Sequence, residues 1–167
     1  MSAESDAQQV QHLAAIRQRL QADGFADQDE TPGPIWWPAL TAEEAEAEWD
    51  PLRHWVVRFC TRFPHAMRIP ACWWRHNDLV EGLSALRDFE RACFSPTAPA
   101  TAAVEWHRAL RDMTSCMEMW AKRFNCFRER GHDLDEPTQE PPRGWDEFVD
   151  ADVQARRQRD HGVSVAD

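Results

Sequence analysis

The feature that most constrains the fold is a series of apolar residues in the second half of the chain. They recur at alternating steps of three and four positions: Ala103, Trp106, Leu110, Met113, Met117, Trp120, Phe124 and Phe127. This spacing places all of them on one face of an α-helix, so the pattern predicts one long helix that ends near Gly131. Bulky aromatic residues fit poorly into the regular holes of a two-stranded coiled coil. We therefore expect this face to lie in the core of its own domain.

Two shorter apolar stripes precede the long helix and predict two further helices. The first stripe consists of Leu52, Trp55, Val56, Phe59, Cys60 and Phe63. The second consists of Leu79, Leu83, Leu86, Phe89 and Cys93. Asp50-Pro51 offers an N-cap and a proline at the first helical position, and Thr41 with Glu44 forms a capping box that predicts a separate short helix before it. All three patterns have helical periodicity, which favours an all-α fold.

Linkers rich in proline, glycine and acidic residues divide the chain into three parts. Residues 1–35 are expected to form an acidic N-terminal helix, starting at Ser5, and a linker. Residues 36–132 are expected to form the core, a compact helical domain built around one long central helix. Residues 133–167 are expected to form an acidic linker and a weak C-terminal helix from Trp145. The fold predicted is all-α, with a loosely attached helix at each end.

The charge of the chain is unevenly distributed along its 167 residues, with a net charge of −10. Residues 1–50 carry eleven acidic side chains and two arginines, and residues 133–167 carry ten acidic side chains and four arginines. Residues 51–132, in contrast, carry eight acidic and thirteen basic side chains. Two interpretations remain open: the acidic ends are simply solvated, or the basic centre meets an anionic partner and the ends tune that contact.

The N-terminus and the cysteines indicate a compartment. The opening sequence is acidic and polar, unlike a secretory signal, and no apolar run is long enough to span a bilayer. Five cysteines, scattered singly, form a poor disulfide framework. We expect a cytoplasmic protein with reduced thiols and no membrane partner.

Four residues suggest a metal site. Cys72 and His76 form one pair and Cys126 and His132 a second, and both pairs fall near predicted helix boundaries. Thiolate and imidazole are the ligands of structural zinc, so one tetrahedral ion could join the two boundaries. The spacing matches none of the strong zinc-finger signatures. The alternative is that Cys72 is a small buried hydrophobe and that His76 bonds a nearby backbone group.

Trp73, Trp74 and Arg75 lie between the first two candidate ligands. Adjacent side chains on a regular element point in different directions, so one indole is a candidate for exposure. An exposed indole beside an arginine can stack on a base or anchor a protein partner. The alternative is that both indoles cover the underside of the loop.

No catalytic motif is present in the sequence. There is no glycine-rich phosphate loop, no G-x-S-x-G and no H-E-x-x-H. We therefore expect a non-enzymatic interaction protein, a monomer or a weak homodimer, that binds a protein partner through its helical surface. The alternative is a nucleic-acid-binding regulator that uses the arginines of the basic centre, Arg53, Arg58, Arg62, Arg87 and Arg91. The two hypotheses differ in whether these arginines share one exposed face.

The runs "IPACWWRHNDLVEGLSAL" and "EWHRAL", followed by a tryptophan and a "C…H" ending, resemble small uncharacterised actinobacterial proteins. Those proteins are encoded on conjugative plasmids, integrated elements and phages. The resemblance covers about residues 36–132, and Asn77 stands where such proteins carry a proline. It implies an accessory role in a mobile genetic element and implies no activity.

Overall fold

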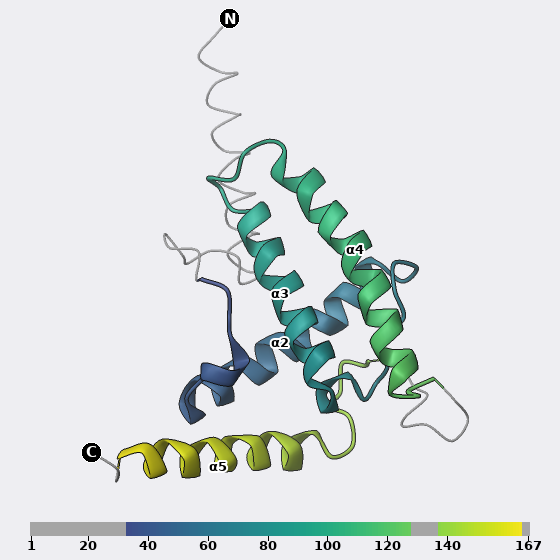
Figure 1. Ribbon diagram of the computed structural model, residues 1–167. Coiled ribbons are helices and arrows are strands. Elements are labelled where there is room, and N and C mark those ends of the chain that lie inside the picture. Colours follow the sequence, from purple (N-terminus) through teal and green to yellow (C-terminus); the bar gives the residue numbers. More distant parts are fainter. Residues whose placement is uncertain (1–32, 128–136, 165–167) are drawn as a thin grey trace, which may run out of the picture. The chain divides into compact units, whose positions relative to one another are not determined.

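The computed structural model describes residues 33–127 and 137–164, which form an all-helical unit (Figure 1). Within these ranges there are four α-helices, two single-turn 3-10 helices and no strand, which confirms the predicted all-α class. The elements are η1 Trp37–Ala39, α2 Ala42–Arg62, η2 Trp73–Arg75, α3 Asn77–Cys93, α4 Ala102–Arg123 and α5 Trp145–Ser164. The helix expected to start at Ser5 lies outside the described residues.

α2 is one continuous helix where the sequence predicted two. It begins at the predicted capping box, in which the Thr41 hydroxyl accepts from the Glu44 amide and the Glu44 carboxylate accepts from the Thr41 amide. Pro51 interrupts the backbone hydrogen bonding but lies on the exposed face, where water can reach the carbonyl that the proline cannot bond. Because Trp49 and Leu52 are buried on either side of it, packing holds the two halves in line.

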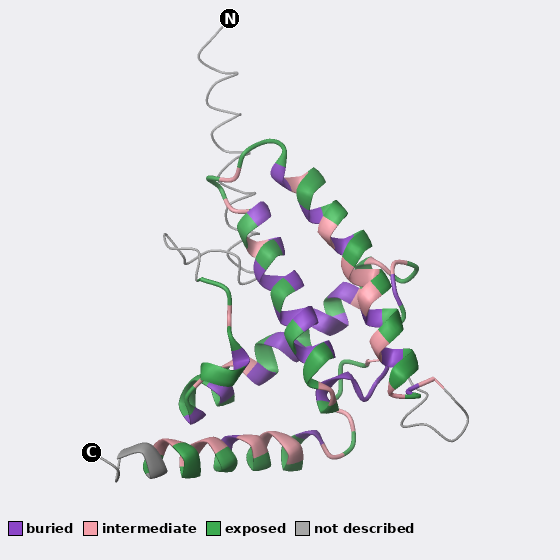
Figure 2. Cartoon of the chain, viewed as in Figure 1, coloured by how far each residue is buried: buried purple, intermediate pink, exposed green. Residues whose placement is uncertain are grey.

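α3 is the element around which the other helices assemble. It lies beside α4 and also contacts η2 and α2, whereas α5 packs on α2 (Figure 1). The predicted central helix, α4, has 22 residues and α2 has 21, so no single long helix dominates the fold. The buried residues of α2 and α3 gather where these helices meet (Figure 2). The core is therefore organised by α3 rather than by the helix with the longest apolar series.

The apolar series of α4 does lie within the core of its own domain. Trp106 and Met117 are fully buried, and Met113 and Trp120 are half-buried and pack against the core. α4 can approach α3 closely because Gly82 has no side chain. A Cβ atom there would lie 2.9 Å from the Met117 methyl group and 3.0 Å from the Trp120 ring.

The second stripe, on α3, differs from the prediction at one position. Leu79, Leu83 and Leu86 are buried as expected, but 39% of Phe89 is exposed. α4 contacts the side of α3 that carries Gly82. Phe89 follows Gly82 by seven residues, so it lies on nearly the same side of α3 about two turns farther along. An apolar side chain in register with a buried stripe is thus left facing solvent.

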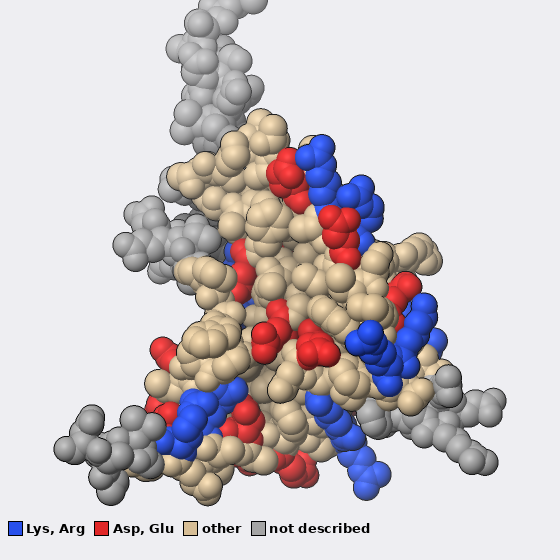
Figure 3. All heavy atoms as spheres, viewed as in Figure 1, with Lys and Arg blue, Asp and Glu red and all other residues tan. Residues whose placement is uncertain are grey.

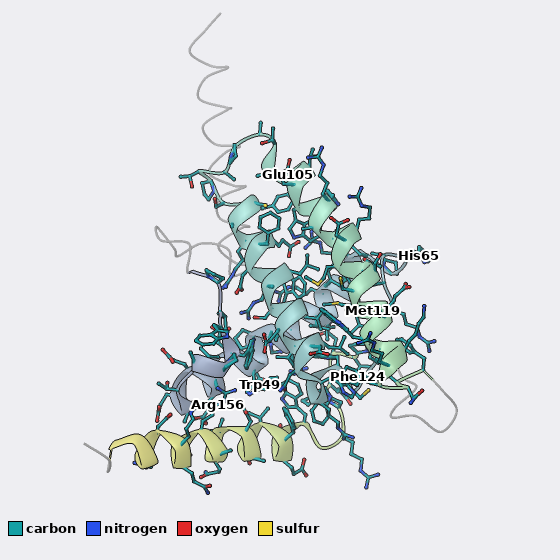
Figure 4. All side chains as sticks on the ribbon, viewed as in Figure 1. Trp49, His65, Glu105, Met119, Phe124 and Arg156 are labelled. Carbon is teal, nitrogen blue, oxygen red and sulfur yellow. The ribbon has the colours of Figure 1, made fainter. Side chains whose placement is uncertain are left out.

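The C-terminal helix, expected to be loosely attached, packs firmly in the same compact unit as the other helices. Trp145 and Val153 of α5 are buried. Asp152 accepts a hydrogen bond from the indole of Trp49 at 3.0 Å, and Arg156 donates to two carbonyl oxygens near η1 (labelled residues in Figure 4). The apolar pattern of α5 is weak because polar side chains make much of the contact with α2.

Candidate metal centre

Cys72 and His76 are brought together by the tight turn η2. The amide of Trp73 donates to the Pro70 carbonyl, and the amide of His76 donates to the Trp73 carbonyl. Cys72 is the N-cap of this turn and His76 its C-cap, and His76 also precedes the first residue of α3. A single 3-10 turn separates the two side chains, so they lie at the same corner of the domain.

Cys126 reaches this corner because α4 ends earlier than its apolar series predicted. The helix stops at Arg123, and Asn125 adopts the left-handed conformation with φ of 57°. The Cys126 amide then donates to the Ala121 carbonyl at 3.1 Å, and the Asn125 amide donates to Lys122. This is a Schellman motif with asparagine at its left-handed position, and it turns Cys126 back toward the core.

The three side chains form a compact cluster. The Sγ atom of Cys126 lies 3.5 Å from Nε2 of His76, and one ligand atom from each of Cys72, His76 and Cys126 lies within 4.8 Å of the others. Two ligands of a tetrahedral zinc ion are about 3.6 Å apart, given zinc–sulfur and zinc–nitrogen bonds of about 2.3 and 2.0 Å. The cluster can therefore hold a metal ion. The fourth predicted ligand, His132, lies outside the described residues.

Burial and stacking fix the cluster in place. Both thiols are fully buried, and His76 is half-buried. The imidazole of His76 stacks on the ring of Phe124, with centroids 4.3 Å apart and an interplanar angle of 10°, at the end of α4 labelled in Figure 4. This stack directs Nε2 of the histidine toward Cys126. The orientation leaves Nε2 as the nitrogen that is placed to bind a metal.

The two adjacent indoles are both buried, so neither is the exposed side chain proposed for base stacking or partner anchoring. Trp73 and Trp74 are 2% and 1% exposed. Trp145 of α5 contacts both rings, at centroid distances of 6.0 and 5.8 Å, and Phe148 packs on Trp74 at 4.8 Å. The second indole is covered by α5, which the sequence did not place there. Arg75 is exposed and lies 4.4 Å above the Trp74 ring.

Two of the five arginines of the basic centre are buried and engaged in the fold. Arg53 donates to the backbone carbonyl of Gln139 at 2.9 Å. Arg87 forms ion pairs with Glu48 of α2 at 2.8 Å and with Asp88 at 3.1 Å. A guanidinium buried in such pairs is not available to phosphate groups. The five arginines therefore do not share one exposed face.

The other three arginines lie nearer the surface. Arg58 and Arg62 lie on the exposed side of the last turns of α2, and Arg62 pairs with Glu90 at 2.7 Å. Arg91 is on α3 and pairs with Asp88. Residues 51–77 contain no acidic side chain, so the end of α2 has a locally basic surface.

The sequence did not indicate that these arginines bind buried carboxylates. Glu90 is 3% exposed, and its two oxygens accept from the Trp55 indole at 2.6 Å and from Arg62 at 2.7 Å. Asp88 is also buried and accepts from Arg87, Arg91 and the backbone amide of Ile35. The spacing could have indicated the burial of Glu90, because Glu90 follows Leu86 by four residues and therefore lies next to the apolar stripe of α3.

Cys93 behaves as the core thiol that the sequence predicted. Burial, and to a lesser degree the carboxylate of Glu105, raises the pKa of the Cys93 thiol above its ordinary value. A raised pKa keeps the sulfur protonated at neutral pH, which is the opposite of what a nucleophilic cysteine needs.

None of the described helices combines the length and the apolar character needed to cross a membrane. No protein-family model matches the chain, and it has no significant similarity to a curated protein or to a solved structure.

Proposed function

We propose that this chain is a non-enzymatic interaction protein whose helical domain is held together by a structural zinc ion. The observation that carries the proposal is the convergence of Cys72, His76 and Cys126 from two helix boundaries on one buried point. Such an ion would join the start of α3 to the end of α4. The helical surface would then bind the protein partner.

The burial of the donor atoms argues for a structural ion rather than a catalytic one. A catalytic zinc site keeps one position open to water or substrate, whereas a structural site is closed by four protein ligands. Both thiols are 0% exposed, so an ion bound to them would be shielded from solvent on the side of the two cysteines. His132, the predicted fourth ligand, would complete a Cys2His2 set.

The surface best suited to a protein partner lies along α3 and α4. Ala85, Phe89 and Ala92 follow one another at helical spacing on α3, and all three are exposed. At about 100° per residue, Phe89 lies about 200° round α3 from Arg87, which pairs with Glu48 of α2. This stripe therefore faces away from α2.

α4 contributes a matching stripe on the same side. Ala109, Met113 and Cys116 are half-buried and lie at helical spacing. Ala109 is about 200° from His107, whose ring contacts Phe63 at the end of α2. In Figure 3 an area without charged side chains covers the C-terminal part of α3 and the adjoining part of α4, acidic side chains lie over the N-terminal part of α3, and charged side chains follow the outer edge of α4.

An uncharged, partly apolar face of this kind suits the apolar side of an amphipathic helix in a protein partner. It does not suit a nucleic acid, which requires positive charge to neutralise its phosphates. The resemblance to proteins of plasmids, integrated elements and phages supports an accessory role in a mobile genetic element. The partner would then be another protein of that element or of its host.

Two substitutions test the binding face. Phe89→Glu places a charge in its centre and should abolish capture of the partner from host extract. Met119→Glu is the matched control, because Met119 is 45% exposed on α4 but lies about 120° round the helix from Met113. Partner capture that survives Phe89→Glu, or that both substitutions abolish equally, would contradict the assignment of this face.

Nucleic-acid binding is the second candidate function, and the basic end of α2 favours it. If Arg58 and Arg62 contact phosphates, affinity for an oligonucleotide should fall steeply with salt. The substitution Arg58→Glu, which spares the pair between Arg62 and Glu90, should then lower the affinity several-fold at low salt. Measuring binding by fluorescence anisotropy, with Arg111→Glu on α4 as the charge-matched control, separates this site from a general charge effect. Wild-type protein that binds no oligonucleotide at low salt would eliminate this second function.

A further inference from the structure

The turn η2 has a candidate metal ligand at each end. Cys72 precedes Trp73 and His76 follows Arg75, so an ion bound to both side chains would restrain the whole turn. Cys126 ties the same ion to the end of α4. The conformation of the three residues between the ligands would then depend on the metal.

The first two turns of α5 rest on these same three residues. Trp145 contacts the rings of Trp73 and Trp74. Phe148 packs on the Trp74 ring, with the two ring centroids 4.8 Å apart. Gly144, immediately before α5, has a φ of 83°, and a Cβ atom there would be in van der Waals contact with the Arg75 guanidinium at 3.5 Å. The start of α5 is therefore positioned by η2 together with Trp49 of α2, whose ring centroid lies 5.7 Å from that of Trp145 and 5.4 Å from that of Phe148.

The later turns of α5 are held by different contacts. Asp152 accepts from the Trp49 indole, Arg156 donates to the carbonyls of Trp37 and Leu40, and Asp160 accepts from the Ala42 amide. None of these partners lies in η2. The two halves of α5 thus share a contact with Trp49 and differ in the rest. Only the first half touches the turn between the metal ligands, and only the second half bonds η1 and the start of α2.

We propose that metal binding at Cys72, His76 and Cys126 controls the docking of the first two turns of α5. This inference rests on the proposed zinc site. With metal bound, η2 is fixed and presents Trp74 to Trp145 and Phe148. Without metal, η2 relaxes, residues 145–150 leave the core, and the later turns remain attached. Release of these turns uncovers an aromatic surface that the metal-bound protein keeps buried.

Hydrogen exchange of the full chain, followed by mass spectrometry with and without a chelator, tests the coupling. Chelation should speed exchange in peptides that cover residues 145–150 about tenfold or more, and zinc should restore the slow rate. Peptides that cover residues 152–160 should change less than about twofold. Equal acceleration across both halves of α5, or none in residues 145–150, would overturn the proposal.

A substitution on the α5 side provides a second measurement that does not disturb the ligands. Phe148→Ala should speed exchange of residues 145–150 in the metal-loaded protein, while about one equivalent of zinc stays bound. Chelation of this variant should then add little further acceleration, because both changes break the same contact. Full additivity of the two effects would show that the metal acts on α5 by another route.

The two proposals fail in different ways. Protein that takes up no zinc contradicts both the structural ion and the coupling. Protein that binds zinc through Cys72 and Cys126 but keeps residues 145–150 protected after chelation contradicts the coupling alone. Cys116→Ser is the control for thiol loss, because Cys116 lies on α4 outside the cluster and should retain both the metal and the docked helix.

Discussion

Two polar clusters join the helices of this domain, and they differ in what completes them. Between α2 and α3, Arg87 pairs with Glu48 and Arg62 pairs with Glu90, so each charge finds an opposite charge within the chain. Between the start of α3 and the end of α4, Cys72, His76 and Cys126 bring together donor atoms that all favour a cation. Folding alone completes the first cluster, whereas the second, in our proposal, is completed by a metal ion. The two ends of α3 should therefore respond to different changes in solution.

Removal of the metal should have the largest effect. A ligand present at a thousand times its dissociation constant stabilises the folded state by about 4 kcal/mol. In a chain of this size that corresponds to a fall in Tm of about 8–16 °C when the metal is removed. Differential scanning calorimetry with and without chelator measures the change.

The control for this prediction is Cys126→Ser, which removes one ligand and should make Tm insensitive to the chelator. The ionic cluster between α2 and α3 should not respond to chelation at all. If the chelator leaves the wild-type Tm unchanged, Cys72, His76 and Cys126 bind no stabilising metal and only pack in the core.

Glu90→Gln should have the next largest effect, and it acts on the other cluster. Glutamine keeps the volume and can still accept from the Trp55 indole, but it removes the charge that faces Arg62. We expect a loss of about 1–3 kcal/mol in the free energy of unfolding, measured by urea denaturation. The Arg62 side chain is half exposed, which favours the lower part of that range.

Glu105→Gln is the matched control for Glu90→Gln. Glu105 pairs with Arg108 at the surface, where both side chains are about half exposed, and its loss should change stability by less than about 0.5 kcal/mol. Equal costs for the two substitutions would mean that burial of Glu90 contributes nothing to the link between α2 and α3.

Cys93 should give the smallest of the three effects, through pH. Its pKa is raised by burial, so the folded state holds the proton more tightly than the unfolded state. That stabilisation is fully present below the thiol's ordinary pKa and is lost as pH rises through the raised value. Between pH 8 and pH 10 the wild type should lose more stability than Cys93→Ala. Parallel curves for the two proteins would contradict this assignment.

The sequence predicted those parts of the fold and site that depend on periodicity and on rare residue types. The stripes of α2 and α4 predicted their buried faces, because spacing along a helix decides which side chains share a face. Cys72, His76 and Cys126 were singled out because thiol and imidazole are uncommon and chemically specific. Their convergence also needed Asn125, whose left-handed backbone ends α4 two residues before it.

The features that the sequence did not predict depend on contacts between distant segments. The burial of Trp74 requires Phe148 and Trp145, and nothing in "CWWRH" indicates that α5 covers it. Glu90 and Arg62 are ordinary charged residues until α2 and α3 meet. Periodicity likewise could not show that Phe89 is left exposed.

Zinc-edge X-ray absorption of the full chain, purified without chelator, is the most direct test for the proposed structural zinc ion at Cys72, His76 and Cys126. We expect one tightly bound zinc per chain, with two sulfur ligands at about 2.3 Å and two nitrogen ligands at about 2.0 Å. Cys116→Ser should give the same spectrum, and Cys126→Ser should lose a sulfur ligand or the metal itself. A protein without zinc, or with zinc bound only through oxygen and nitrogen, would contradict the proposal that the two thiols hold a structural zinc ion.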